Sequence, residues 1–91
     1  MSVQVVSYDL RRPGQDYPGL FEAIKTFGAW WHHLESVWLV NTCLTSGQIR
    51  DALRSHLHEN DTLVVATLGG NWAACGLSSA GANWLRENIA R

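Results

Sequence analysis

Alternating apolar and polar residues, with turn residues at the boundaries, predict four short strands in this chain. The predicted strands cover residues 3–9, 29–33, 36–44 and 62–68. A tight turn near Leu34-Glu35 joins the second strand to the third, and a turn at Asn60-Asp61 precedes the strongly apolar fourth strand. The second and third strands are therefore expected to form a hairpin.

Apolar residues at helical spacing predict three helices, one after the first strand, one after the third and one after the fourth. They cover residues 17–27, 46–57 and about 79–89. Each has a capping residue just before it, namely Asp16, Thr45, and Ser78 or Ser79. Pro18 falls in the first turn of the first helix, and Gly28 is well placed to end that helix. Thr45-Ser46-Gly47-Gln48 forms a capping-box pattern.

The order strand-helix-strand-strand-helix-strand is that of the split β-α-β, or ferredoxin-like, arrangement. We therefore predict an α+β fold, with a single domain over residues 1–91 and a C-terminal extension after the fourth strand. In this arrangement the helices over 17–27 and 46–57 cover one face of an antiparallel sheet.

The other face of the predicted sheet should be polar if it meets water, yet the alternation makes it apolar as well. Val37 and Leu39 point away from Trp38 and Val40, so both sides of that strand carry large apolar groups. A second copy of the chain is the simplest cover for such a face. The sequence therefore predicts a homodimer that pairs through its sheets.

Composition narrows the range of partners. The chain has 91 residues, of which 46% are hydrophobic, and a formal net charge of −1, so any contact with nucleic acid would depend on local basic patches. Cys43 and Cys75 lack the spacing of a disulfide framework, which fits a reducing compartment. With no signal segment and no apolar run of membrane-spanning length, we expect a cytoplasmic protein that does not insert into membranes.

Three stretches of the sequence resemble those of a known family. They are Val-Val-Ser-Tyr-Asp-Leu at 5–10, Leu-Glu-Ser-Val-Trp-Leu-Val at 34–40, and Leu-Thr-Ser-Gly-Gln-Ile-Arg-Asp-Ala-Leu at 44–53. With the apolar strand at 62–68, their order and spacing are similar to those of Cas-two, the small CRISPR-associated adaptation subunit, and its free-standing relatives. The resemblance covers roughly residues 3–68 and implies a ferredoxin-like homodimer that binds RNA or DNA or cleaves it.

The resemblance also implies roles for two residues. Asp9 matches the aspartate that ends the first strand in the family and binds Mg²⁺ or Mn²⁺, opposite its counterpart in the dimer, in members that cleave nucleic acid. Ser36, which opens the Ser-Val-aromatic strand, matches a neighbour of that site. The loop after Asp9 and the C-terminal stretch with Trp72 and Trp84 differ from those of adaptation subunits, which favours a stand-alone homologue.

Each candidate residue also has a structural interpretation. A carboxylate at the end of an apolar strand needs hydrogen bonds, a counter-charge or a metal, so Asp9 either binds a metal or pairs with Arg11 or Arg12. The basic groupings are formed by four arginines, Arg11, Arg12, Arg50 and Arg54, which either contact phosphates or are ordinary solvated residues. Arg50 and Arg54 share a helical face and are partly neutralised by nearby acids.

The tryptophans over 30–38 either stack on bases or belong to the core or a dimer interface. The histidines and cysteines lack zinc-site spacing. Three functions stay open: a metal-dependent nuclease with Asp9 as its catalytic carboxylate, a non-catalytic dimeric module that binds nucleic acid, a nucleotide or a protein, and the toxin of a toxin–antitoxin pair.

Overall fold

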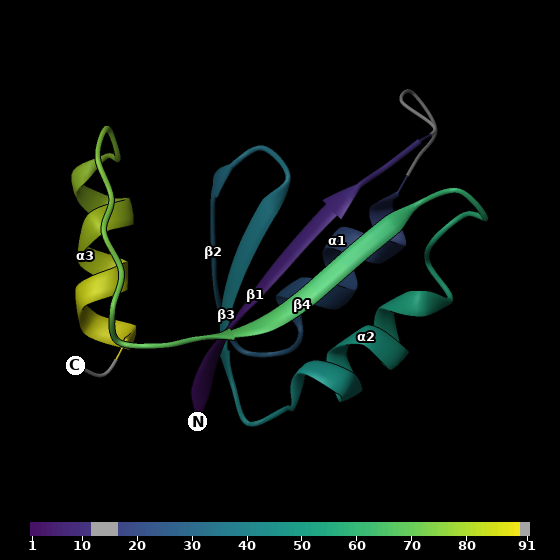
Figure 1. The fold of residues 1–91 in the computed structure, drawn as a ribbon, viewed down its shortest axis with the longest axis horizontal. Helices are drawn as coiled ribbons and strands as arrows, with labels where there is room; N and C mark the ends of the chain where they lie inside the picture. The colour runs from purple at the N-terminus through teal and green to yellow at the C-terminus, as the bar shows by residue number, and fades with distance from the viewer. Residues whose placement is uncertain (12–16, 90–91) are drawn as a thin grey trace.

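The computed structural model describes residues 1–11 and 17–89, and these form seven elements (Figure 1). In chain order they are β1 (Ser2–Asp9), α1 (Pro18–Lys25), β2 (Ala29–Leu34), β3 (Val37–Thr42), α2 (Ser46–Arg54), β4 (Thr62–Leu68) and α3 (Ser79–Asn88). The type and order of every predicted strand and helix are confirmed. The helices are shorter than predicted, since α1 ends at Lys25 and α2 at Arg54.

The four strands form one antiparallel sheet in the order β2-β3-β1-β4. β1 lies between β3 and β4, with Val5 opposite Leu39 on one side and Ala66 on the other. The two β-α-β units are therefore each split by a strand of the other unit. This topology is a small α+β single domain compatible with a ferredoxin-like fold.

One face of the sheet, here called the first face, is covered by α1 and α2 as predicted. Leu20 and Ile24 of α1 and Ile49 and Leu53 of α2 are fully buried. They pack on strand residues of the same cluster, Val6, Tyr8, Trp38 and Val40. Both helices can be seen on the same side of the sheet in Figure 1.

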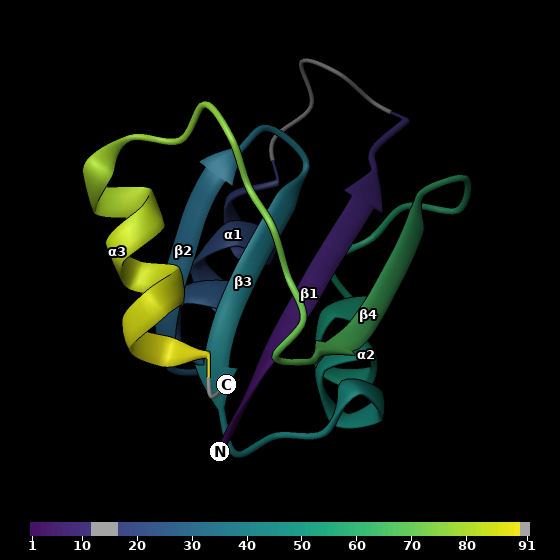
Figure 2. The same cartoon turned by 60° about the vertical axis from the view of Figure 1, so that its left-hand side comes forward.

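The opposite face, here called the second face, has a helix of its own, so the expectation of a helix-free face is wrong. Leu85 of α3 and the following Ile89 pack on Val3, Trp31 and Leu39 of the sheet. The indole N–H of Trp31 also donates a hydrogen bond to the Gly81 carbonyl in α3 at 3.0 Å. Residues 69–78, here called the connecting segment, cross this face from β4 to α3 (Figure 2).

Hydrogen-bonded caps begin two of the three helices. The Thr45 hydroxyl accepts from the Gln48 amide and the Gln48 side chain accepts from the Thr45 amide, which confirms the capping box. Ser78 is the N-cap of α3, with its hydroxyl accepting from the Gly81 amide. The N-cap of α1 is Tyr17 rather than Asp16, and Asp16 lies outside the described residues.

Two expectations from composition can be compared with the described part of the chain. Cys43 and Cys75 are both free and exposed, in agreement with the prediction that they form no disulfide framework. Among the helices within residues 1–11 and 17–89, none has the length and apolar character needed to cross a membrane.

Candidate functional site

Asp9 is the last residue of β1 and lies where the strand leaves the sheet. Alternation along β1 places it on the second face, with Val3, Val5 and Ser7, while Tyr8 packs in the first-face core. The Asp9 carboxylate pairs with the Arg11 guanidinium at 3.1 Å, and both side chains are 61% exposed. The counter-charge predicted for Asp9 is therefore present, in the form of a solvated surface pair.

Ser36 lies at the same end of the sheet but contacts β1 through its backbone. It is an exposed turn residue between β2 and β3, not the first residue of the third strand as predicted. Its carbonyl accepts a hydrogen bond from the Tyr8 amide at 3.2 Å, one residue before Asp9. The fold thus brings Asp9, Arg11 and the Ser36 backbone together at one edge.

Arg50 and Arg54 belong to a different surface. Both lie on the exposed side of α2, and both pair with Asp51, at 3.0 and 3.6 Å. This agrees with the interpretation of solvated arginines partly neutralised by a nearby acid. Arg12, the fourth arginine predicted to contact phosphate, lies outside the described residues.

The ligands that one chain offers to Mg²⁺ or Mn²⁺ at Asp9 are too few for a site. Within the described ranges, no three His, Cys, Asp or Glu side chains gather closely enough to hold an ion. Mg²⁺ binds through one or two carboxylates and keeps several waters. At Asp9 the described residues of one chain supply one exposed carboxylate, already paired with Arg11. With the described residues alone, a metal would fit there if a second copy added its own Asp9.

Among the described residues at this end of the sheet, Asp61 is the carboxylate with the most hydrogen bonds, and the sequence indicated it only as a turn residue. It accepts hydrogen bonds at 2.7 Å from the amides of Arg11 and His58, and at 2.9 and 3.1 Å from the Tyr17 hydroxyl. Burial alone raises the pKa of Asp61, but these hydrogen bonds outweigh it and lower the pKa from its ordinary value of 3.8. Asp61 therefore connects Arg11 and Tyr17, the described residues on either side of 12–16.

The sequence contains a local signal for Asp61 but does not show which residues form hydrogen bonds with it. Asn60-Asp61 directly precedes an apolar strand, just as Asp9 directly follows one. The side chains and amides that bind Asp61 come partly from residues 44 and 50 positions away. A carboxylate at the start of an apolar strand is the signal that could have indicated such a site.

The predicted tryptophans divide into core and surface residues. Trp31 and Trp38 are 4% and 3% exposed and belong to the cores of the second and first faces. Trp30 is 44% exposed, with the Lys25 ammonium 5.3 Å from its ring centroid. Core membership is confirmed for the first two, and Trp30 is the one of the three whose ring is exposed on the outer surface.

β4 is an edge strand of the sheet, and its side chains leave part of the second face exposed. Val64 is 65% exposed, and Ala66 beside it is exposed as well. Val64 lies opposite Ser7 and Thr62 lies opposite Asp9, so this strip runs along β4 to the Asp9–Arg11 pair. We call Thr62, Val64 and Ala66 the β4 strip.

A scan of the sequence against protein-family models finds no match, and a search of the solved structures finds none that matches this chain.

Proposed function

We propose that this chain is a stand-alone Cas-two-like protein that forms a homodimer along β4 and binds nucleic acid without needing to cleave it. The observation that carries the proposal is the β4 strip, which is uncharged, exposed and continuous with the Asp9–Arg11 pair. Pairing along this strip would extend the sheet into one joint surface that carries the Arg11 residues of both copies.

The edge position of β4 supports self-association. An edge strand presents unpaired backbone N–H and C=O groups, and proteins usually protect such an edge with charge, proline or a bulge. β4 reads Thr-Leu-Val-Val-Ala-Thr-Leu, with no charged residue and no proline. Its regular pairing with β1 continues without interruption from Val3 to Asp9.

Sedimentation analysis of Val64→Glu tests the dimer, with Ala52→Glu as its matched control. Val64 and Ala52 are both exposed, so neither change should unfold the chain, but only Val64 lies on the β4 strip. The expected result is a dimer for the wild type and Ala52→Glu, and a monomer for Val64→Glu. A wild type that stays at 10.1 kDa at all accessible concentrations would end the dimer proposal.

Binding of single-stranded and duplex RNA and DNA can be followed by fluorescence anisotropy over a range of salt concentrations. Arg11→Ala should weaken binding and lower the salt dependence by about one unit for each phosphate contact that is lost. Arg86→Ala on α3 is the control, since Arg86 contacts Asn83 and lies outside the proposed site. Equal effects of the two substitutions would contradict phosphate binding at Arg11.

Metal-dependent cleavage is the second candidate, and the position of Asp9 at the end of β1 is what favours it. It requires a dimer in which the two Asp9 residues face each other, where their carboxylates would hold Mg²⁺ or Mn²⁺, which would serve to neutralise a phosphate. Asp9→Asn distinguishes the two candidates, with Asp51→Asn as the matched control because both carboxylates are 61% exposed and paired with arginine.

The two candidates predict opposite results for Asp9→Asn. A nuclease would lose its metal-dependent cleavage in Asp9→Asn and keep it in Asp51→Asn. A binding module would show no cleavage in any variant, and its affinity for nucleic acid would stay the same or rise because a negative charge beside Arg11 has been removed.

A further inference from the structure

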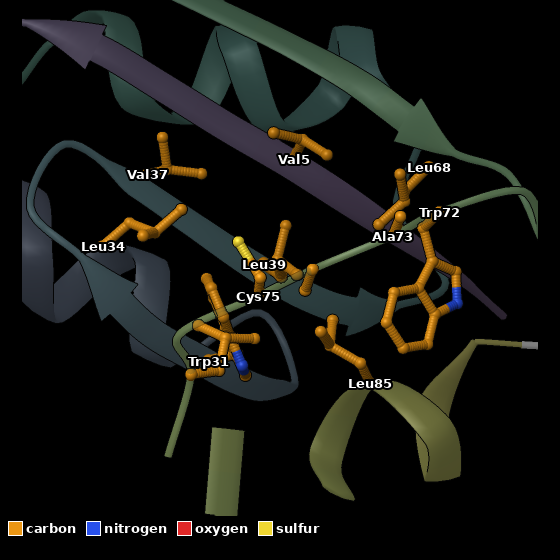
Figure 3. Close-up of a pocket in the computed structure, with 12 residues that line it drawn as sticks. Val5, Trp31, Leu34, Val37, Leu39, Leu68, Trp72, Ala73, Cys75 and Leu85 are labelled. Atoms are coloured by element: carbon orange, nitrogen blue, oxygen red, sulfur yellow. The ribbon is translucent and has the colours of Figure 1, made fainter. Parts of the chain in front are cut away.

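A groove opens between the second face of the sheet and the connecting segment (Figure 3). Its volume is about 320 Å³. Its floor is formed by Trp31, Leu39 and Leu85, which are only 4–6% exposed. Ala73, Ala74 and Cys75 of the connecting segment form the opposite wall, and the half-exposed Leu34 lies at the rim.

The lining of the groove carries no charge. It consists of Val, Leu, Ala and Trp side chains and the thiol of Cys75. The indole N–H of Trp31 is already used in its bond to Gly81. An ionic group inside this groove would lose its hydration without gaining a partner, so the lining selects against charged ligands.

The volume sets the size of a ligand. A dry apolar cavity of about 150 Å³ is large enough to bind benzene, and ligand pockets in proteins begin at about 300 Å³. The groove therefore suits a molecule of two or three rings, or a hydrocarbon chain of similar volume. A macromolecular partner is less well matched, because the deepest residues lie beneath the connecting segment rather than on an open surface.

We propose that this groove is a binding site for a small, uncharged, apolar molecule. The ligand would lie between the connecting segment and the sheet, in contact with the rings of Trp31 and Trp72 and the side chain of Leu39. The inference is independent of the proposed function, since it does not involve Asp9, Arg11 or the β4 strip.

Two probes with the same ring skeleton test the proposal. N-phenyl-1-naphthylamine is neutral, and 8-anilinonaphthalene-1-sulfonate carries a sulfonate on the same skeleton. Both fluoresce in apolar surroundings, and Trp31 and Trp72 can transfer excitation to either one. We expect saturable binding of one neutral probe per chain. The sulfonated probe should bind at least roughly tenfold more weakly, as judged by its Kd.

The two exposed cysteines allow the site to be located. Cys75 lines the groove (Figure 3), whereas Cys43 lies in the loop after β3. Alkylation of Cys75 by N-ethylmaleimide in the Cys43→Ser variant should abolish binding of the neutral probe. The same reagent on Cys43 in a Cys75→Ser background should leave it unchanged.

Three results would overturn the proposal. One is the absence of saturable binding by the neutral probe. Another is equal affinity for the neutral and sulfonated probes, which would indicate general adsorption to apolar surface. The third is binding that survives modification of Cys75, which would place the probe elsewhere. Circular dichroism of the modified proteins checks that the fold is intact, and a Cys75→Phe substitution provides a second way to fill the groove.

Discussion

Shortening Leu85 to alanine is expected to destabilise the protein strongly, because Leu85 joins α3 to the second face of the sheet. Leu85 is 5% exposed and packs in a cluster with Trp31, Leu39 and Ile89. If α3 were merely appended to the domain, the same substitution would have almost no effect. Leu85→Ala therefore measures whether the C-terminal helix belongs to the folded core.

The expected size follows from the surroundings of the side chain. Replacing a buried leucine by alanine costs about 2–5 kcal/mol, and the cost rises with the cavity that remains. Leu85 also lines the groove, so one side of it already lacks packing partners, and we expect the lower part of the range, about 2–3 kcal/mol. For a domain of this size that corresponds to a fall in Tm of roughly 8–24 °C.

Two further leucines provide an internal scale. Leu53 in the first-face core is fully buried, so Leu53→Ala should cost about 3–5 kcal/mol. Leu34 is 50% exposed, so Leu34→Ala should cost less than about 1 kcal/mol. Urea unfolding followed by circular dichroism, at several protein concentrations to separate folding from association, gives the three values. If Leu85→Ala and Leu34→Ala proved equally mild, the packing of α3 described above would be refuted.

Two other predictions concern Asp61 and Gly28. Because the folded-state pKa of Asp61 is lowered, its stabilising contribution should be fully present above pH 3.8 and disappear as the pH falls through the folded-state pKa. Urea unfolding should thus give a larger free energy of unfolding for the wild type than for Asp61→Asn at neutral pH, and this difference should disappear in acid. A difference that does not change with pH would contradict this prediction. A Cβ on Gly28 would overlap the Asn41 carbonyl oxygen, so Gly28→Ala should lower stability by about 1–3 kcal/mol in thermal unfolding. Gly69 has open space around it, so Gly69→Ala should change stability by less than about 0.5 kcal/mol. Equal effects of the two substitutions would count against the close approach of Gly28 to Asn41.

The strands and their faces could be predicted from the sequence because they depend on local alternation. Val37 and Leu39 lie in the second-face cluster, and Trp38 and Val40 lie in the first-face cluster, as the pattern predicted. The capping box at Thr45 is equally local, since its two hydrogen bonds join residues three apart. Features of this kind need only neighbouring residues and the geometry of one element.

The cover on the second face could not be predicted in the same way. Apolar spacing over 79–89 indicates a helix but does not say which surface the helix will meet. That choice depends on how the connecting segment crosses the sheet and on contacts such as the bond from Trp31 to Gly81, which are 50 residues apart. The sequence correctly indicated that the second face needs to be buried. It did not indicate that α3 of the same chain buries part of that face.

Buried polar groups were missed for a related reason. Gln4 is 2% exposed, and its amide is bonded to Ser46 of α2 and Thr67 of β4, at 2.5 and 2.9 Å. In the sequence Gln4 is one polar residue in an alternating strand pattern, and these two hydrogen-bonding partners are 42 and 63 residues away. Asp61 is a second example, since two of its three hydrogen-bonding partners, Arg11 and Tyr17, are distant in the sequence.

The second face combines three environments, which is why its two proposed roles can be separated. At the β2 side, α3 buries Trp31 and Leu39. Beneath the connecting segment the same apolar surface forms the groove, and at β4 it is exposed around Val64. Val64→Glu changes the exposed strip and modification of Cys75 changes the groove, and neither side chain lines the other region. Loss of the dimer with probe binding retained, or the reverse, would therefore assign each role to its own part of the face.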